Sequence, residues 1–363
     1  MSANTVTPHR RRPTEGASRA AGKQRGRGQR IRRGIVWTLL VVLVVAGGTG
    51  WYLYHKLDSN LGGGVDLHKA LGDDRPEQLP ASGTNLLVLG SDSRSGANKG
   101  LAGGSSGGLS DTTLIVHIPE GRKKATAVSI PRDTLVTRPS CQARDGSAQS
   151  SRKRVMFNSI YPLAGPACVV KTVEQMSGVR MSHFIEIDFS GFNGLVNAIG
   201  GVHITLKEPI KNGANGLNLP SGPQKLNGAQ ALDFVRTRHG VGDGSDLGRI
   251  GNQQVFMLAM LGEIQRQDLL GSPVKSLKIA NAASESLTTD SDLASLTALA
   301  KFGRSLKGVN PDSMETIMLP VEYDKIDPYR VVSAEPQAST LWKAIREGKE
   351  IPASARKSPA TGG

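Results

Sequence analysis

The chain has 363 residues, 38% of them hydrophobic and 21% charged, ordinary values for a protein with one large or two small folded domains. Its formal charge of +14 is unevenly distributed, because residues 1–33 hold ten Lys or Arg and one acid, Glu15. This tail carries +9 and leaves +5 for the other 330 residues, so the body of the chain is only mildly basic. A nucleic-acid-binding domain is therefore disfavoured, and no nucleic-acid partner is expected.

The N-terminal region predicts a membrane anchor. Residues 1–33, rich in Arg, Gly and Pro, are expected to be a disordered tail. Residues 34–54 are 21 positions without a charge, and a helix of that length, at about 1.5 Å per residue, crosses a hydrocarbon core of ~30 Å. A cleaved signal peptide is the alternative, disfavoured because no clear cleavage site follows. The positive-inside rule predicts a single-pass protein of the cell membrane, with a cytoplasmic N-terminus and an extracytoplasmic body.

The rest of the chain predicts one α/β domain. Residues 55–83, rich in Gly and Pro, are expected to form an extracytoplasmic stalk. Short apolar runs predict strands, at residues 85–90, 113–117, 125–130, 184–188, 202–206 and 315–319. Helical patterns alternate with them, at residues 169–177, 249–270, 292–306 and 341–346. This alternation predicts a three-layer α/β sandwich with a central mixed β-sheet over residues 84–347. Residues 348–363 are polar and are expected to be a disordered C-terminal tail.

The two cysteines, Cys141 and Cys168, both fall on the predicted outer side of the membrane. An even number of cysteines in an oxidising compartment favours one disulfide. Two free buried thiols, or a metal site, are the alternatives. The nearest histidines are not at ligand spacing, which favours the disulfide.

Acidic residues mark the ends of two neighbouring predicted strands. Asp92 and Arg94 follow the strand at residues 85–90, and Asp111 opens the next strand. A pair of carboxylates on adjacent strand ends can bind a hard divalent cation through oxygen, typically Mg²⁺. For either aspartate taken alone, a role as a turn residue is the more common one.

Arginines are the second chemical signal. Arg132 leaves a predicted strand at the bend fixed by Pro131, and Arg236 and Arg238 point to one face if residues 234–238 form a strand. A guanidinium reads phosphate oxygens bidentately, although a surface salt-bridge ladder is the alternative. Arginines that converge with acidic metal ligands are typical of phosphoryl-transfer sites. A Walker-type loop, a Ser-His-Asp motif and a zinc-spaced cluster are not found in the sequence.

Taken together and in order, these motifs resemble the LytR–CpsA–Psr family of Gram-positive cell walls. The matching segments are residues 85–94, 110–112, 129–134, 157–158, 200–202 and 235–254. The resemblance implies a phosphotransferase that moves a glycopolymer-phosphate from a polyprenyl-pyrophosphate carrier to a sugar hydroxyl of peptidoglycan, forming a phosphodiester. The implied partners are that lipid-linked glycan, peptidoglycan and membrane lipid. The resemblance does not specify which glycopolymer is transferred.

The resemblance also assigns residues by motif. Asp92 and Asp111 are the implied ligands of Mg²⁺ (or Mn²⁺), and Asp246 is implied to orient the clamp or to accept the hydroxyl proton. The implied pyrophosphate-binding set, here called the arginine clamp, consists of Arg132, Arg236, Arg238 and Arg249. The implied substrate-binding residues are Arg94, Asn158, Gln253 and Gln254.

Two positions depart from the family pattern, because Leu109 and Asn252 stand where arginines are usual. Weaker turnover, a different glycan, or compensation by Lys153 or Arg154 are the three interpretations. Two other functions use the same residues. One is a pyrophosphatase in which water replaces the sugar hydroxyl, and the other is a non-catalytic scaffold that binds the lipid carrier or the wall. Transcriptional attenuation is disfavoured, since the predicted membrane span separates the basic tail from the domain.

Overall fold

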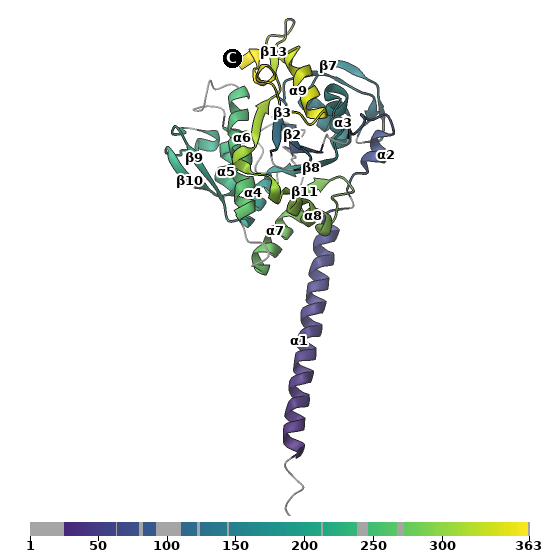
Figure 1. The fold of residues 1–363 in the computed structure, drawn as a ribbon, viewed down its shortest axis with the longest axis vertical. Helices are drawn as coiled ribbons and strands as arrows, with labels where there is room; N and C mark the ends of the chain where they lie inside the picture. The colour runs from purple at the N-terminus through teal and green to yellow at the C-terminus, as the bar shows by residue number, and fades with distance from the viewer. Residues whose placement is uncertain are drawn as a thin grey trace, which may run out of the picture. The chain divides into compact units, whose positions relative to one another are not determined.

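The computed structural model describes residues 25–62, 64–79, 83–91, 110–121, 124–143, 145–211, 213–237, 246–266 and 272–361. The chain divides into two units, residues 1–54 and residues 55–363. Helix α1 (Arg25–Asn60) begins in the first unit (Figure 1). Its segment Gly34–Asn60 has a mean hydropathy of 1.9 and is a candidate membrane span by length and composition, a test that a signal sequence also passes. The helix expected over residues 34–54 is therefore confirmed.

A six-stranded sheet forms the centre of the second unit, in the order β11-β8-β1-β2-β3-β12 (Figure 1). Two neighbouring pairs, β1 with β8 and β3 with β12, are parallel and the other three are antiparallel, so the sheet is mixed as predicted. The strands are β1 (Thr84–Ser91), β2 (Ser110–Ile118), β3 (Thr126–Ser129), β8 (His183–Asp188), β11 (Leu287–Thr289) and β12 (Glu315–Met318). The run at residues 202–206 is also a strand, β9 (Val202–Leu206), but it pairs with β10 (Gly222–Leu226) in a separate sheet.

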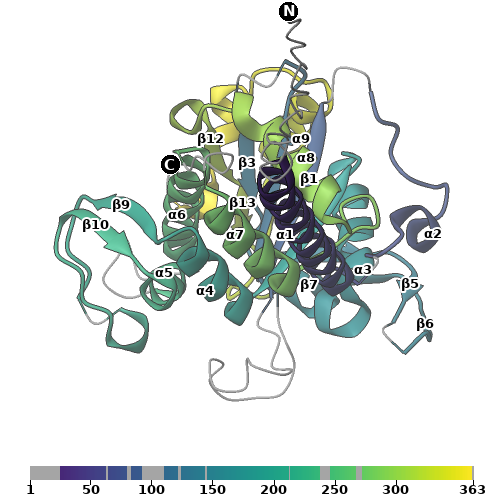
Figure 2. The same cartoon turned by 90° about the horizontal axis from the view of Figure 1, so that it is seen from below.

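Helices cover both faces of the sheet and complete the three-layer sandwich (Figure 2). On one face, α3 (Ile160–Ser177) and α9 (Gln337–Arg346) pack on β1, β2 and β8, and Leu87, Ile115 and Phe184 are fully buried there. The other face packs against α6 (Asp246–Arg266). Further helices are α2 (Leu67–Leu71), α4 (Phe189–Ala198), α5 (Gly228–Arg236), α7 (Pro273–Ser286) and α8 (Leu296–Ser305). Apolar side chains of the central strands point to both faces of the sheet, so a separate hydrophobic core forms between the sheet and each layer of helices.

Residues 55–83 differ from the predicted stalk. Helix α1 continues to Asn60, and its Leu57 side chain is buried. Leu67 and Leu71, the two buried residues of α2, join the main hydrophobic core. The backbone N–H of Val65 donates to the carbonyl of Thr289 at 2.9 Å. The described part of this segment therefore belongs to the folded domain, because leucines four residues apart supply an apolar face among the polar residues and glycines.

The C-terminal residues also differ from the expected disordered tail. A 3₁₀ helix, Ala353–Arg356, follows α9, and Ile351 and Ala355 are buried in the main core. The hydroxyl of Ser358 accepts from the backbone N–H of Val321 at 3.1 Å and donates to its carbonyl at 2.9 Å. This segment is thus packed into the main core through Ile351 and Ala355, and against β13 (Val321–Tyr323) through Ser358.

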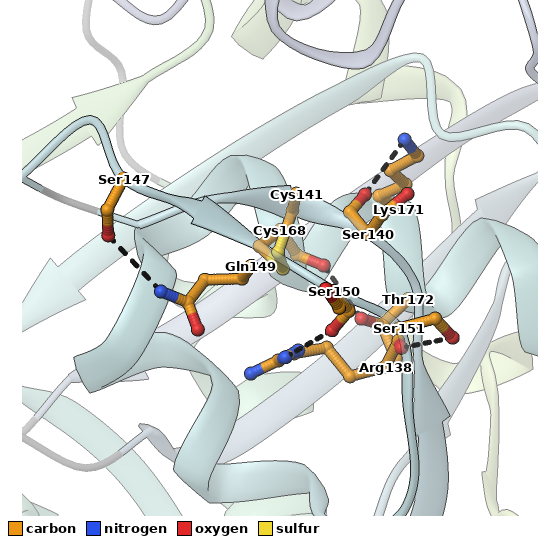
Figure 3. The surroundings of a disulfide bond; sticks show 10 residues. All are labelled: Arg138, Ser140, Cys141, Ser147, Gln149, Ser150, Ser151, Cys168, Lys171 and Thr172. Carbon is orange, nitrogen blue, oxygen red and sulfur yellow. Dashed lines mark hydrogen bonds between the residues drawn. A yellow bond between two sulfur atoms is a disulfide. The ribbon is translucent and has the colours of Figure 1, made fainter.

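The predicted disulfide is present between Cys141 of β5 (Cys141–Gln142) and Cys168 of α3 (Figure 3). The bond connects α3 to the segment between β4 (Leu135–Arg138) and β7 (Arg152–Met156). This segment also contains β6 (Ala148–Gln149). Lys171 of α3 donates to the Ser140 carbonyl at 3.1 Å beside it. The segment is thereby attached to α3 close to the end of β4.

Candidate active site

The ends of β1 and β2 meet at one edge of the sheet. Gly90 pairs with Thr112 and Ser91 pairs with Ser110, so a register shift leaves Asp111 as one extra residue on β2. Such bulges commonly re-aim a side chain beside a functional site. Asp92, Arg94 and the side chain of Asp111 lie outside the described residues. The backbone register brings the ends of β1 and β2 together, while the metal site and its carboxylates stay a prediction.

Arg132 sits in a turn that three backbone-directed hydrogen bonds define. Thr134 donates to the carbonyl of Pro131 through its N–H, at 3.1 Å, and through its hydroxyl, at 2.6 Å. The N–H of buried Asn158 donates to the carbonyl of Arg132 at 3.1 Å. The Arg132 Nε lies 3.4 Å from Oδ2 of Asp133. Asn158 is expected to bind substrate, and in the structure its backbone N–H stabilises the turn that carries Arg132.

Arg236 ends a helix, and the strand expected over residues 234–238 is wrong. Helix α5 begins with a capping box, in which the Asn227 side chain accepts from the N–H of Gln230 and the Gln230 side chain accepts from the N–H of Asn227. This start signal outweighs the alternating pattern at the C-terminal end. The Arg236 guanidinium lies 4.7 Å above the centroid of the Phe189 ring, a cation–π contact. Because Arg236 belongs to a helix, it does not share a strand face with Arg238, which lies outside the described residues.

Helix α6 carries Arg249 and Gln253 one turn apart on one face, and both are buried. The Gln253 Nε2 donates to the carbonyl of Val235 at 3.4 Å, and the Gln254 Nε2 donates to Oγ of Ser129 at 3.1 Å. These bonds connect α6 to the end of α5 and to β3. Asp246 opens α6, but its side chain lies outside the described residues.

Asn252, at a position where the family usually has arginine, is buried and faces α5. Its Nδ2 donates to the carbonyl of Thr237 at 3.4 Å. Arg154, one of the two residues considered as compensation, is engaged elsewhere, since it binds both carboxylate oxygens of Asp324 at 3.0 and 2.7 Å. That guanidinium, with the backbone N–H of Asp327, holds the pKa of Asp324 far below its usual value. Arg154 therefore organises a loop, which makes compensation by Arg154 a poor explanation.

Two neighbouring cavities bring three clamp arginines together. The larger has a volume of about 500 Å³ and the smaller about 220 Å³, and Arg249 and Gln253 line both. Arg132 lines the larger cavity and Arg236 the smaller. The other residues of the larger cavity are Thr113, Ser129, Ile130, Pro131, Asp133, Ile250, Tyr323, Pro328, Tyr329 and Val331. Those of the smaller cavity are Thr112, Phe189, Ala214, Asn215 and Val235. Two adjoining cationic cavities that share one buried arginine are suited to a ligand with two linked anionic groups.

Three residues that line the larger cavity were not predicted from the sequence. Tyr323 and Tyr329 come from the hairpin of β13 and β14 (Val331–Ser333), together with Pro328. The available signal was two tyrosines around a turn with the sequence Asp327-Pro328-Tyr329, which sequence reasoning did not connect with the arginine motifs.

The model of the LytR_cpsA_psr family matches residues 53–347. The chain belongs to this family. The match begins before the predicted stalk, in agreement with the packing of α2 and residues 55–61 into the domain.

Relatives of this LytR–CpsA–Psr protein are named for cell-wall synthesis. The cell wall biosynthesis protein LcpA of Corynebacterium glutamicum is 28% identical over 294 residues, which are 72% of this chain and 55% of LcpA. This chain thus spans about half the length of LcpA. The polyisoprenyl-teichoic acid–peptidoglycan teichoic acid transferase TagU of Oceanobacillus iheyensis is 28% identical over 277 residues, covering 72% of this chain and 77% of TagU. A solved structure of TagT bound to LIIa-WTA shares the fold, with a TM-score of 0.58, 20% identity, and coverage of 78% of this chain and 98% of TagT.

Proposed function

We propose that this LytR–CpsA–Psr protein transfers a glycopolymer-phosphate from a polyprenyl-pyrophosphate carrier to a sugar hydroxyl of peptidoglycan. The observation that carries the proposal is the convergence of Arg132, Arg236 and Arg249 on two adjoining cavities. The names of the relatives TagU and TagT support the same class of reaction, since TagU is named a teichoic acid transferase and the TagT structure holds LIIa-WTA.

In the proposed reaction, the oxygen of the acceptor hydroxyl attacks the phosphorus that bears the glycan. A new P–O bond forms, and the bond from that phosphorus to the bridging oxygen of the pyrophosphate breaks. Polyprenyl phosphate leaves, and a general base, for which Asp246 is the candidate, takes the hydroxyl proton. Arg249, in the wall between the cavities, would bind both phosphates, with Arg132 and Arg236 on either side. Fixed guanidinium groups in a buried site stabilise the charge that develops on the phosphoryl oxygens.

We further propose a Mg²⁺ ion at the edge where β1 and β2 meet, held by Asp92 and Asp111. Oxygen ligands of this kind suit a hard divalent cation, which would neutralise phosphate charge when bound. In the proposed topology, α1 anchors the protein in the cell membrane, residues 1–33 remain in the cytoplasm, and the domain is extracytoplasmic. The lipid carrier would reach the site from that membrane.

The test uses the full-length chain in detergent micelles with a glycan-labelled polyprenyl-pyrophosphate donor and peptidoglycan, with and without Mg²⁺. Label should appear on the peptidoglycan with the wild type. Arg132→Ala and Arg249→Ala should each lower kcat/KM by about 100-fold or more, because each removes a charge-assisted contact to phosphate. Arg304→Ala, which removes an exposed arginine of α8, is the matched control and should retain activity.

Other results would select another function. Release of free glycan-phosphate without attachment to peptidoglycan would identify a pyrophosphatase. Tight binding of the donor without turnover, with or without Mg²⁺, would identify a binding protein and overturn the transferase proposal. Equal activity of Arg249→Ala and the wild type would exclude the two cavities as the active site.

A further inference from the structure

The larger cavity has an aromatic rim, defined here as Tyr323, Pro328 and Tyr329, which lines it together with Arg132 and Arg249. We propose that this aromatic rim binds a sugar ring of a glycan. The inference rests on the proposed function and extends it by assigning a glycan subsite next to the phosphate-binding arginines.

Both tyrosine side chains of the aromatic rim are largely exposed to solvent. The exposed fraction is 55% for Tyr323 and 86% for Tyr329, although both line the cavity. An aromatic side chain of this size is usually more buried, and a solvated ring beside a polar cavity is typical of a ligand-binding surface. Neither ring is needed to fill the core, because the inward residues of the hairpin, Val321 and Val331, already do so.

The loop that presents the rings is fixed at both ends by ion pairs. At one end, Asp324 accepts two hydrogen bonds from Arg154 and two from the backbone N–H groups of Ile326 and Asp327. At the other end, Arg330 donates to the carboxylate of Asp133 at 2.8 Å. Arg154 adopts a φ of 56°, a conformation that non-glycine residues keep only where their surroundings require it. The rim is therefore organised before a ligand arrives, which lowers the entropy lost on binding.

The chemistry of the rim favours a sugar over other ligands. The flat faces of aromatic rings pack against the C–H face of a pyranose, while the tyrosine hydroxyls exchange hydrogen bonds with its hydroxyl groups. The cavity joins this surface to Arg132 and Arg249, so a ligand that fills it combines an anionic group with an uncharged ring. In a glycan-phosphate the first sugar is attached directly to the phosphate. The bound sugar can belong to the donor glycan or to the acceptor glycan, since both reach the phosphorus during transfer.

The experiment measures binding in the absence of turnover, with the full-length chain in detergent and without Mg²⁺. Three probes are titrated by calorimetry: a phosphate-free peptidoglycan glycan fragment, a polyprenyl-pyrophosphate-linked sugar, and polyprenyl pyrophosphate without sugar. The variants are Tyr329→Ala, Tyr323→Ala and Tyr329→Phe. Ile326→Ala is the matched control, because Ile326 is 78% exposed on the same loop but is not among the described residues that line the cavity.

Each alanine variant should weaken binding of at least one sugar-bearing probe by about tenfold, the scale of a lost aromatic contact. Tyr329→Phe should stay within about threefold of the wild type because the ring is retained, and Ile326→Ala should bind as the wild type does. Binding of sugar-free polyprenyl pyrophosphate should not change. A loss confined to the glycan fragment identifies the acceptor as the source of the sugar, and a loss confined to the lipid-linked sugar identifies the donor.

The proposal is overturned if both alanine variants bind all three probes with wild-type affinity, or if the sugar-free probe is weakened as much as the sugar-bearing ones. The first of these results, together with normal transfer by the wild type, would refute the aromatic rim and leave the proposed function intact. Sugar binding that depends on the rim in a protein without transferase activity would instead refute the proposed reaction alone.

Discussion

Arg330 and Asp133 form an ion pair of 2.8 Å that joins the β13–β14 hairpin to the turn carrying Arg132, since the other oxygen of Asp133 lies 3.4 Å from the Arg132 Nε. We predict that Asp133→Asn lowers kcat/KM for the lipid-linked donor by roughly tenfold, because Arg132 loses the charge that orients it. The free energy of unfolding should change by less than about 1 kcal/mol, since the ion pair is partly exposed. Steady-state kinetics and urea denaturation measure the two effects.

Asp327→Asn is the control for that substitution. Asp327 lies 3.9 Å from Arg330 and does not orient Arg132, so its replacement should leave donor kinetics within about twofold. Equal kinetics for Asp133→Asn and the wild type would show that Arg132 is oriented without the carboxylate.

Gly228, the first residue of α5, marks a close approach between two helices that position Arg236. A Cβ at Gly228 would lie 2.3 Å from the backbone oxygen of Asn193 in α4. We predict that Gly228→Ala lowers the free energy of unfolding by about 1–3 kcal/mol, as overpacking does. Gly194→Ala in α4, where nothing lies within 4 Å, should be neutral or stabilising by about 0.5–1 kcal/mol. Urea denaturation of both variants checks the prediction, and equal stability would contradict the contact.

The central strands β1 and β2 are predicted correctly because their side chains are buried on both faces of the sheet. Leu86 and Leu87 in β1, like Leu114 and Ile115 in β2, are neighbours in apolar runs and are buried although they point to opposite faces, a pattern that few other structures produce. The end of α5 was predicted wrongly because Val235 and Arg236 alternate as in a strand, while the deciding capping box lies eight residues upstream at Asn227. Local alternation is a weaker signal than a helix start that fixes two backbone N–H groups.

The Cys141–Cys168 disulfide closes a loop with a sequence separation of 27 residues. In the chain-entropy model a loop of this length stabilises the folded domain by about 3–4 kcal/mol. We predict a corresponding loss for the Cys141→Ser, Cys168→Ser double variant, seen as a lower urea midpoint. Reduction of the wild-type protein should reproduce the loss, and the double variant should be insensitive to reductant. An unchanged midpoint in both experiments would contradict a constraining role for this bond.

Buried His117 predicts acid sensitivity of the central sheet. Burial lowers its pKa from 6.5 to about 4, and its Nδ1 lies 2.8 Å from Oδ1 of Asn85. Between those two pH values the unfolded imidazole binds a proton that the folded one does not, so the free energy of unfolding falls as the pH falls. The loss can reach about 3 kcal/mol at pH 4. Denaturation measured from pH 7 to pH 4 should show this slope, and His117→Gln should reduce it; equal slopes would assign the effect to other groups.

The sequence predicts which residues belong to the site but not how they are brought together in space. Arg132, Arg236 and Arg249 are recognisable from their motifs, yet their convergence depends on α6, which hydrogen-bonds to α5 through Gln253 and to β3 through Gln254. These elements are far apart in the sequence, and no local periodicity reports their contact. The turn sequence between the two tyrosines of the rim predicts a hairpin but not a cavity, and only the hairpin geometry brings them to the arginines.

The hydrogen bonds between Ser358 and Val321 have a practical consequence for dissecting this protein. The family match ends at residue 347, but Ile351 and Ala355 complete the main core and Ser358 pairs with the strand that begins the tyrosine-bearing hairpin. The segment that the family model matches is therefore shorter than the unit that folds in this chain. A truncation placed at the boundary of shared sequence would remove the support of one active-site wall, and the resulting loss of activity would be mistaken for a catalytic role of the deleted segment.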